Sequence, residues 1–221
     1  MTAPRHLLLD FGGVCLLTPV ELHAGVGRSL GLEPGAIAWK GPFDPEGDPL
    51  WRRMLAGEVT ERGYWAQRAR ELGEASGRGS DWTTRDYMHV CYALPEETLV
   101  RKGALSIVAD AKAAGRKVGV LTNDLEAFHG PEWVASITFL EGMDSLTDAS
   151  ITRILKPDPR AYQQALSDLG VSADEVVFVD DQPGNVKGAE AFGIDAVWFD
   201  VRNPEKSWAE ARERMGLPPA R

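Results

Sequence analysis

Short apolar segments that alternate with amphipathic helical patterns place the strongest limit on the fold of this chain. Buried strands are predicted at residues 6–10, 117–122, 175–180 and 196–199. Helices are predicted at residues 98–114, 159–169, 184–192 and 204–215. Strands and helices in this alternation form a parallel sheet that helices cover on both faces. The sequence therefore predicts a doubly wound, Rossmann-like α/β core, with one further strand at either 137–140 or 145–146.

Residues 18–95 carry a different pattern. Apolar positions recur there at helical spacing, first around Trp51 and then in a second segment for which Thr60 is a typical helix start. No run in this stretch has the pattern of a strand. We therefore predict an α-helical domain at 18–95, inserted into an α/β core that comprises residues 1–17 and 96–221.

Charge and cysteine content argue against several classes of function. The formal net charge is −9, which disfavours a nucleic-acid-binding protein, because the phosphate backbone requires a positively charged surface. Cys15 and Cys91 belong to no zinc-binding pattern. Two free thiols indicate a cytoplasmic protein. No apolar stretch has the length of a membrane span, so no membrane partner is expected.

Polar side chains follow three of the predicted strands at the point where each strand ends. Asp10, Thr122 and the pair Asp180 and Asp181 occupy these positions, and Lys156 lies in the loop before a helix. In a doubly wound sheet, ligands bind outside the carboxyl ends of the strands. Two adjacent carboxylates repel each other unless a cation is near. The sequence therefore predicts a ligand site, with a cation, at this edge of the sheet.

Four segments resemble, in order, the four motifs of the haloacid dehalogenase superfamily. They are LDFGGV at 9–14, LTN at 121–123, LKPDP at 155–159 and VDDQPGNVKGA at 179–189. One such short segment alone would be weak evidence, so the resemblance depends on their common order and on their places at strand ends and loops. It implies that the insert is a helical cap, similar to that of the phosphatase domains at the N-terminus of epoxide hydrolases.

The resemblance further implies a Mg²⁺-dependent phosphatase that acts on a small phosphate ester through an aspartyl phosphate on Asp10. Mg²⁺ prefers oxygen ligands. The implied metal site consists of oxygen-bearing groups, namely Asp10, the Gly12 carbonyl, Asp181, Asp180 and, through water, Asn185. Lys156 would pair with both Asp10 and the phosphate. The Thr122 hydroxyl and the Asn123 N–H would bind phosphate oxygens.

Gly12 departs from the family pattern, because most phosphatases of this superfamily carry a second Asp there as general acid and base. Such catalysis is worth about 10²- to 10⁴-fold in rate. Four explanations stay open: a substrate with a good leaving group, a replacement acid such as His23 or Asp124, a slow enzyme, or a phospholigand-binding relative without turnover. A 2-haloacid dehalogenase is the second hypothesis, although dehalogenases need no metal and lack the adjacent carboxylate pair.

Side chains outside the motifs receive simpler assignments. The tryptophans of the insert are predicted to form its small core, and they are Trp39, Trp51 and Trp65. Its arginines are expected in solvent, and they are Arg52, Arg53 and Arg68. His23 is expected at the surface, whereas Cys15 is expected to be buried. The identity of the substrate and the oligomeric state do not follow from these patterns.

Overall fold

The chain divides into two compact units in the computed structural model, which describes residues 5–220. The first unit contains the described residues up to Leu17 together with those from Glu96 onward, and the second contains Thr18–Pro95. Between residues 5 and 220, each helix is too short or too polar to serve as a membrane span.

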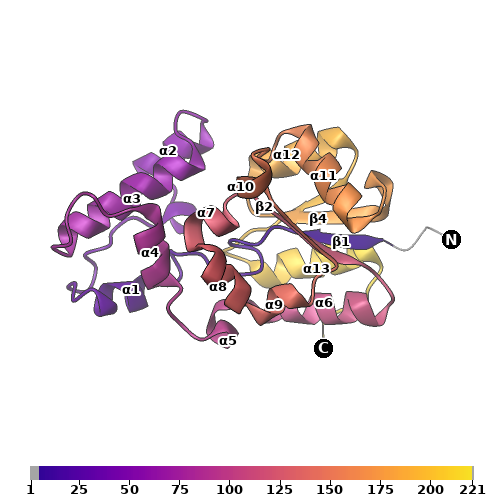
Figure 1. Cartoon of the computed structure of the whole chain (residues 1–221), viewed down its shortest axis with the longest axis horizontal. Helices are drawn as coiled ribbons and strands as arrows, with labels where there is room; N and C mark the ends of the chain where they lie inside the picture. Colours follow the sequence, from indigo (N-terminus) through magenta and orange to yellow (C-terminus); the bar gives the residue numbers. More distant parts are fainter. Residues whose placement is uncertain (1–4, 221) are drawn as a thin grey trace. The chain divides into compact units, whose positions relative to one another are not determined.

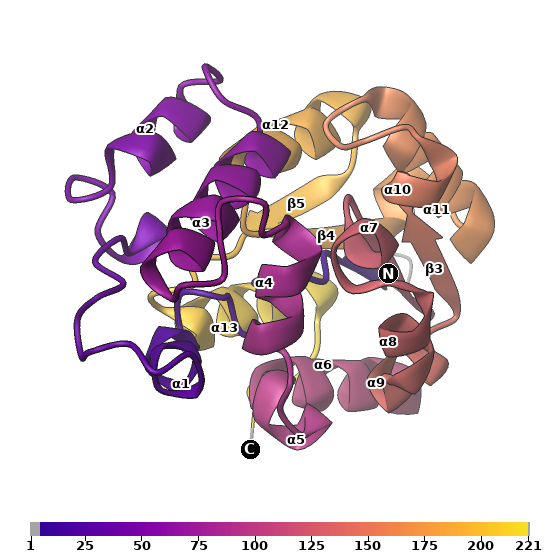
Figure 2. The same cartoon turned by 60° about the vertical axis from the view of Figure 1, so that its left-hand side comes forward.

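Five parallel strands form the sheet of the first unit over its described residues (Figures 1 and 2). They are β1 (His6–Leu9), β2 (Val118–Thr122), β3 (Ser145–Asp148), β4 (Val176–Asp180) and β5 (Asp195–Trp198). Their order across the sheet is β3-β2-β1-β4-β5, and each neighbouring pair is parallel. The central strands β1, β2 and β4 are buried, as expected when helices cover both faces. The predicted doubly wound α/β fold is confirmed.

Helices cover both faces of this sheet. α11 (Pro159–Leu169) and α12 (Pro183–Phe192) pack against one face, and α6 (Lys102–Ala113) and α13 (Pro204–Met215) pack against the other (Figure 1). α11 begins as predicted, because the Asp158 carboxylate accepts the N–H of Arg160. The shorter helices are α5 (Glu96–Leu99), α7 (Leu125–His129), α8 (Pro131–Ser136), α9 (Thr138–Glu141), α10 (Ala149–Thr152) and the 3₁₀ turn η2 (Ala173–Glu175).

The single helix predicted at 98–114 is wrong, because the chain forms α5 and α6 with a break between them. Val100 makes an isolated antiparallel bridge with Leu16. The backbone N–H of Arg101 donates to the Cys15 carbonyl at 2.8 Å. These long-range backbone contacts hold two residues in extended conformation, and helical periodicity gives no sign of them.

The alternative strand position at 137–140 is also wrong, and the strand lies at Ser145–Asp148 as the other alternative proposed. Thr138–Glu141 is helix α9. The Glu96 carboxylate accepts the backbone N–H groups of Thr138 and Phe139 at 2.9 and 2.7 Å. An anion at this position stabilises the start of a helix and therefore favours α9 over a strand.

The second unit contains helices and no strand over residues 18–95, all of which are described. Its elements are α1 (His23–Ser29), the 3₁₀ turn η1 (Gly41–Phe43), α2 (Pro49–Leu55), α3 (Glu61–Ala75) and α4 (Thr84–Cys91) (Figure 2). The Thr60 hydroxyl accepts an N–H group at the start of α3, as its sequence position predicts. Trp51 and Trp65 are buried in the predicted small core, and Trp39 is half-buried beside them.

One arginine of the second unit contradicts its predicted position in solvent. Arg52 and Arg53 are exposed as expected, but Arg68 is buried. Its guanidinium forms an ion pair with the buried carboxylate of Asp48 and lies 4.9 Å from the centre of the Trp39 ring. A buried charge requires a partner and hydrogen bonds. Asp48 and, on α3 itself, Glu71 supply these. Asp48 lies before α2, so the sequence pattern of α3 does not reveal this buried partner.

Candidate active site

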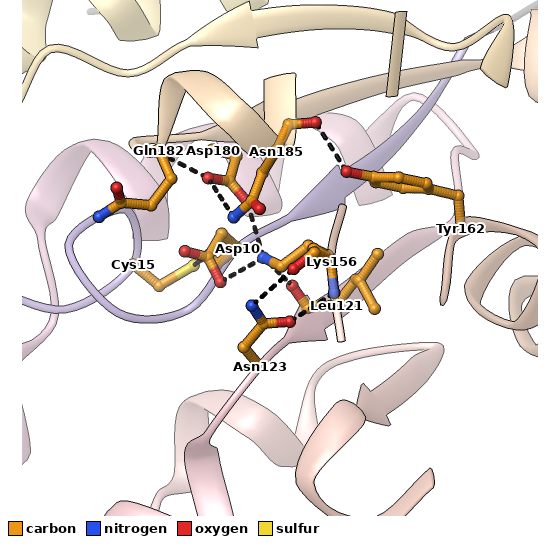
Figure 3. A network of polar contacts seen from close by, with 9 residues as sticks. All are labelled: Asp10, Cys15, Leu121, Asn123, Lys156, Tyr162, Asp180, Gln182 and Asn185. Atoms are coloured by element: carbon orange, nitrogen blue, oxygen red, sulfur yellow. Dashed lines mark hydrogen bonds and ion pairs between the residues drawn. The ribbon is translucent and has the colours of Figure 1, made fainter. Parts of the chain in front are cut away.

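Three strands of the sheet end in residues that the sequence assigned to a site. Asp10 follows β1, Thr122 ends β2 and Asp180 ends β4. These strands are parallel neighbours, so their carboxyl ends meet at one edge of the sheet. Lys156 enters the same place from the loop between α10 and α11 (Figure 3). The structure therefore brings together residues from all four motifs.

The buried Lys156 ammonium joins the strand ends. Its Nζ donates to Asp10 Oδ1 at 2.8 Å, to the Leu121 carbonyl at 2.8 Å and to Asp180 Oδ2 at 2.7 Å (Figure 3). Three acceptors match the three N–H donors of an ammonium group. The Leu121 carbonyl is a partner that the sequence could not indicate, because every residue has such an acceptor.

Asn123 holds the loop that carries Lys156. Its Oδ1 accepts the backbone N–H of Lys156 at 2.8 Å, and its Nδ2 donates to the Lys156 carbonyl at 3.2 Å. The side-chain amide thereby fixes the main chain on both sides of the Lys156 Cα. The sequence assigned only the backbone N–H of Asn123 to a ligand, and this structural use of its side chain was missed.

The carboxylate of Asp180 is completely buried and accepts hydrogen bonds on both oxygens. Oδ1 accepts the N–H of Gln182 at 2.8 Å, Oδ2 accepts the Lys156 ammonium, and Asn185 Nδ2 lies 3.1 Å from each oxygen. The Asn185 carbonyl in turn accepts the Tyr162 hydroxyl at 2.7 Å. Asp180 is thus held rigidly, and it holds Lys156 in place.

Burial and charge together set the protonation of this network. Burial raises the pKa of Asp10 to about 6, although the Lys156 ammonium opposes this shift. Burial alone would lower the pKa of Lys156, but the carboxylates of Asp10 and Asp180 outweigh it and raise that pKa above its ordinary value. At pH 7, Lys156 is therefore a cation and Asp10 is mainly a carboxylate, the form in which it can attack as a nucleophile.

A group of three carboxylates lies at this edge of the sheet. One oxygen each from Asp10, Asp180 and Asp181 lies within 4.8 Å of the other two. The donors are all oxygens, which suits Mg²⁺ better than a soft metal such as zinc. The neighbouring Gly12 is exposed, and a Cβ added to it would meet no atom within 4 Å. The residues present therefore fit a magnesium ion, and position 12 has room for a larger side chain.

The other residues discussed from the sequence lie in different surroundings. Thr122 is buried at its strand end, and Asp124 is buried at the start of α7. Cys15 is buried as predicted, and its Sγ donates to the Asp10 carbonyl at 3.2 Å. His23 belongs to the second unit and is half-buried against Trp39, so its predicted surface position is wrong. Burial lowers the pKa of His23 to about 4, which leaves it neutral at pH 7.

Arg101 is a further residue near the site that no motif indicates. It is buried, and its Nε donates to the Gly13 carbonyl at 2.9 Å. Gly13 lies in the loop that follows Asp10 and carries Gly12. Arg101 therefore fixes this loop from a point far along the chain, a contact that only the folded structure reveals.

Comparisons with known proteins agree on one family of hydrolases. Residues 45–193 match the family model of the haloacid dehalogenase-like hydrolases. A phosphoserine phosphatase from Thermus thermophilus is 32% identical over 188 residues, which are 84% of this chain and 66% of that protein. The (S)-2-haloacid dehalogenase 1 from a Pseudomonas species is 32% identical over 175 residues, which are 76% of this chain and 72% of that protein.

Two further matches differ in coverage. Acyl-CoA dehydrogenase family member 10 from mouse is 24% identical over 97% of this chain, but this chain spans only 19% of its length. The crystal structure of a HAD phosphatase from Thermococcus onnurineus has a TM-score of 0.58 and 18% identity, with 98% of this chain and all of that chain covered. That likeness supports the fold.

Proposed function

The chain belongs to the haloacid dehalogenase-like hydrolases, and on that premise we propose that it is a Mg²⁺-dependent phosphatase of small phosphorylated metabolites. The observation that carries the proposal is the group of three carboxylates, two of which pair with one lysine. Asp10, Asp180 and Asp181 bring three negative charges, and Lys156 offsets one of them. Neighbouring carboxylates destabilise one another's charged forms. A divalent cation would offset the two charges that remain.

The proposed reaction has two steps at Asp10. A carboxylate oxygen of Asp10 attacks phosphorus, the bond between phosphorus and the leaving oxygen breaks, and an aspartyl phosphate is formed. Water then attacks this phosphorus, which releases inorganic phosphate and restores the carboxylate. Lys156, 2.8 Å from Asp10 Oδ1, orients the nucleophile and offsets charge on the transferred group. Thr122 and the N–H of Asn123 bind phosphate oxygens.

We assign the magnesium ligands to Asp10, Asp181 and the Gly12 carbonyl, with Asp180 beside them. The bound ion would supply positive charge that offsets the repulsion between the phosphate ester and the Asp10 carboxylate. Both oxygens of Asp180 already accept hydrogen bonds from protein donors. The main task of Asp180 is therefore to hold the Lys156 ammonium and, with Asn185, to orient water around the ion.

Gly12 limits the class of substrate, because it can give no proton to the leaving group. A substrate whose leaving oxygen is stable as an anion needs no such proton, and aryl, acyl and anomeric sugar phosphates have this property. We further propose that residues 18–95 act as a cap domain that selects among such esters. The cytoplasmic location stays a prediction from the sequence.

A 2-haloacid dehalogenase is the second candidate. A relative with that name is 32% identical to this chain. The sequence resemblance also implies that dehalogenases lack the acid at the position of Gly12. In that reaction Asp10 would attack carbon, expel halide and form an ester that water hydrolyses. The adjacent carboxylates Asp180 and Asp181 favour the phosphatase, because the dehalogenase reaction has no use for a cation. A relative that binds a phospholigand without turnover is the third candidate.

A comparison of two reactions separates these candidates. Phosphate release from p-nitrophenyl phosphate is measured with Mg²⁺ and with EDTA, and halide release from 2-chloropropionate is measured with EDTA. We expect Mg²⁺-dependent phosphate release that is lost in Asp10→Asn. Halide release without metal would establish the dehalogenase instead. Tight binding of an ester without either product would establish the binding protein.

A further inference from the structure

Trp198 is a large aromatic residue that the fold leaves exposed. It is the last residue of β5, and 45% of its surface is accessible, whereas its neighbours Val197 and Phe199 are buried. Phe199 packs on the Trp208 ring at a centroid distance of 4.8 Å and fixes the main chain here. An indole that stays half in solvent gains little from apolar burial. A polar contact gives a better account of its position.

The indole Nε1 of Trp198 donates to the backbone carbonyl of Asp181 at 2.9 Å. β4 and β5 are parallel with Asp180 opposite Trp198, and the N–H of Phe199 donates to the Asp180 carbonyl at 2.9 Å. Two successive carbonyl groups, those of Asp180 and Asp181, are therefore held from the end of β5. The second is held by a side chain, so its hydrogen bond depends on residue type.

Asp181 lies just beyond the end of β4, where the sheet no longer fixes the main chain. One of its carboxylate oxygens lies within 4.8 Å of oxygens from Asp10 and Asp180. Mg²⁺ demands near-ideal ligand geometry. Partners that orient a ligand typically change metal affinity by about 10- to 100-fold when removed.

We infer that Trp198 is a positioning residue for the metal site: its indole N–H fixes the Asp181 backbone so that the carboxylate faces Asp10 and Asp180. This inference rests on the proposed Mg²⁺ dependence. The chemistry of the reaction does not involve Trp198, so its loss acts on metal affinity and leaves the turnover at saturating metal nearly intact.

The test compares three variants with the unchanged chain. Trp198→Phe keeps an aromatic ring and removes the N–H donor, Trp198→Gln returns a donor of similar reach, and Trp82→Phe controls for loss of an indole in the other unit. Mg²⁺ affinity is measured by calorimetric titration, and the thermal midpoint is measured in EDTA. Phosphate release is then followed as a function of Mg²⁺ concentration.

We expect Trp198→Phe to bind Mg²⁺ about 10-fold more weakly, with kcat at saturating Mg²⁺ within about twofold and an unchanged midpoint in EDTA. Trp198→Gln should recover part of the affinity, and Trp82→Phe should bind Mg²⁺ as tightly as the unchanged chain. Equal Mg²⁺ affinity in Trp198→Phe and the unchanged chain would overturn the inference alone. An unchanged chain that neither binds Mg²⁺ nor responds to it would overturn the inference together with the proposed function.

Discussion

Removal of the buried cation at Lys156 should destabilise the fold strongly. Lys156→Met keeps an unbranched side chain that is shorter by one heavy atom, and it removes hydrogen bonds to Asp10, the Leu121 carbonyl and Asp180. It also leaves two buried carboxylates without their shared cation. Breaking a buried pair on one side costs about 3–5 kcal/mol. For a chain of this size, that corresponds to a fall of about 6–20 °C in the thermal midpoint.

The loss of stability in Lys156→Met should depend on pH, and the pKa of Asp10 determines the direction of this dependence. Burial raises this pKa from 3.8 to about 6 even while Lys156 opposes the shift, so it should rise further in Lys156→Met. A carboxyl whose pKa is higher in the folded state binds more protons there than in the unfolded chain. The free energy of unfolding therefore falls as the pH rises from the unfolded-state pKa of Asp10 to its folded-state pKa, and it becomes level above that. The deficit of Lys156→Met should be largest near pH 8 and smaller near pH 5.

Thermal unfolding in EDTA between pH 5 and pH 8 measures both effects. The matched control is the double variant Lys156→Met with Asp10→Asn, which removes one of the two uncompensated carboxylates. We expect the double variant to recover more than about 1 kcal/mol relative to Lys156→Met, since residues in direct contact couple by about 0.5–3 kcal/mol. A Lys156→Met chain with an unchanged midpoint, or with a deficit independent of pH and of Asp10→Asn, would show that Lys156 does not stabilise the fold through the charge of Asp10.

Two further predictions concern glycines. Gly12→Asp should speed hydrolysis of alkyl phosphates by about 10-fold or more, because its Cβ meets no atom within 4 Å and its carboxyl can supply the missing proton. Steady-state rates of hydrolysis of alkyl phosphate esters measure this effect, and Gly12→Asn is the control. Gly188→Ala should lower stability by about 1–3 kcal/mol, because the new Cβ would lie 2.7 Å from the Pro157 Cβ beside Lys156. Gly184→Ala on the same helix meets nothing and should leave the midpoint unchanged or higher.

The core fold could be predicted because local patterns and long-range structure agree in it. The strands that became β1, β2 and β4 are apolar runs, and helix α11 carries its own start signal at Asp158. Prediction failed where a distant group decides the local structure. The break before α6 depends on a bridge to Leu16, and the helix α9 depends on the Glu96 carboxylate.

The members of the candidate site could be predicted because their residue types mark the ends of strands. The contacts between these residues could not be predicted from the sequence. The hydrogen bonds from Lys156 to the Leu121 carbonyl and from Arg101 to the Gly13 carbonyl involve backbone acceptors, which any sequence provides. The burial of Arg68 could not be predicted either, since its buried partner Asp48 lies in another segment. Sequence therefore indicates the chemistry here better than the geometry.

A rapid acid quench of the chain during turnover of p-nitrophenyl phosphate with Mg²⁺ would show whether Asp10 carries the transferred phosphoryl group. We expect a burst of nitrophenol and a peptide heavier by one phosphoryl group at Asp10, because Gly12 cannot activate the water of the second step. Neither signal should appear in EDTA or in Asp10→Asn. Steady phosphate release with linear kinetics and no phosphoryl group on Asp10 would argue against an aspartyl phosphate at this residue.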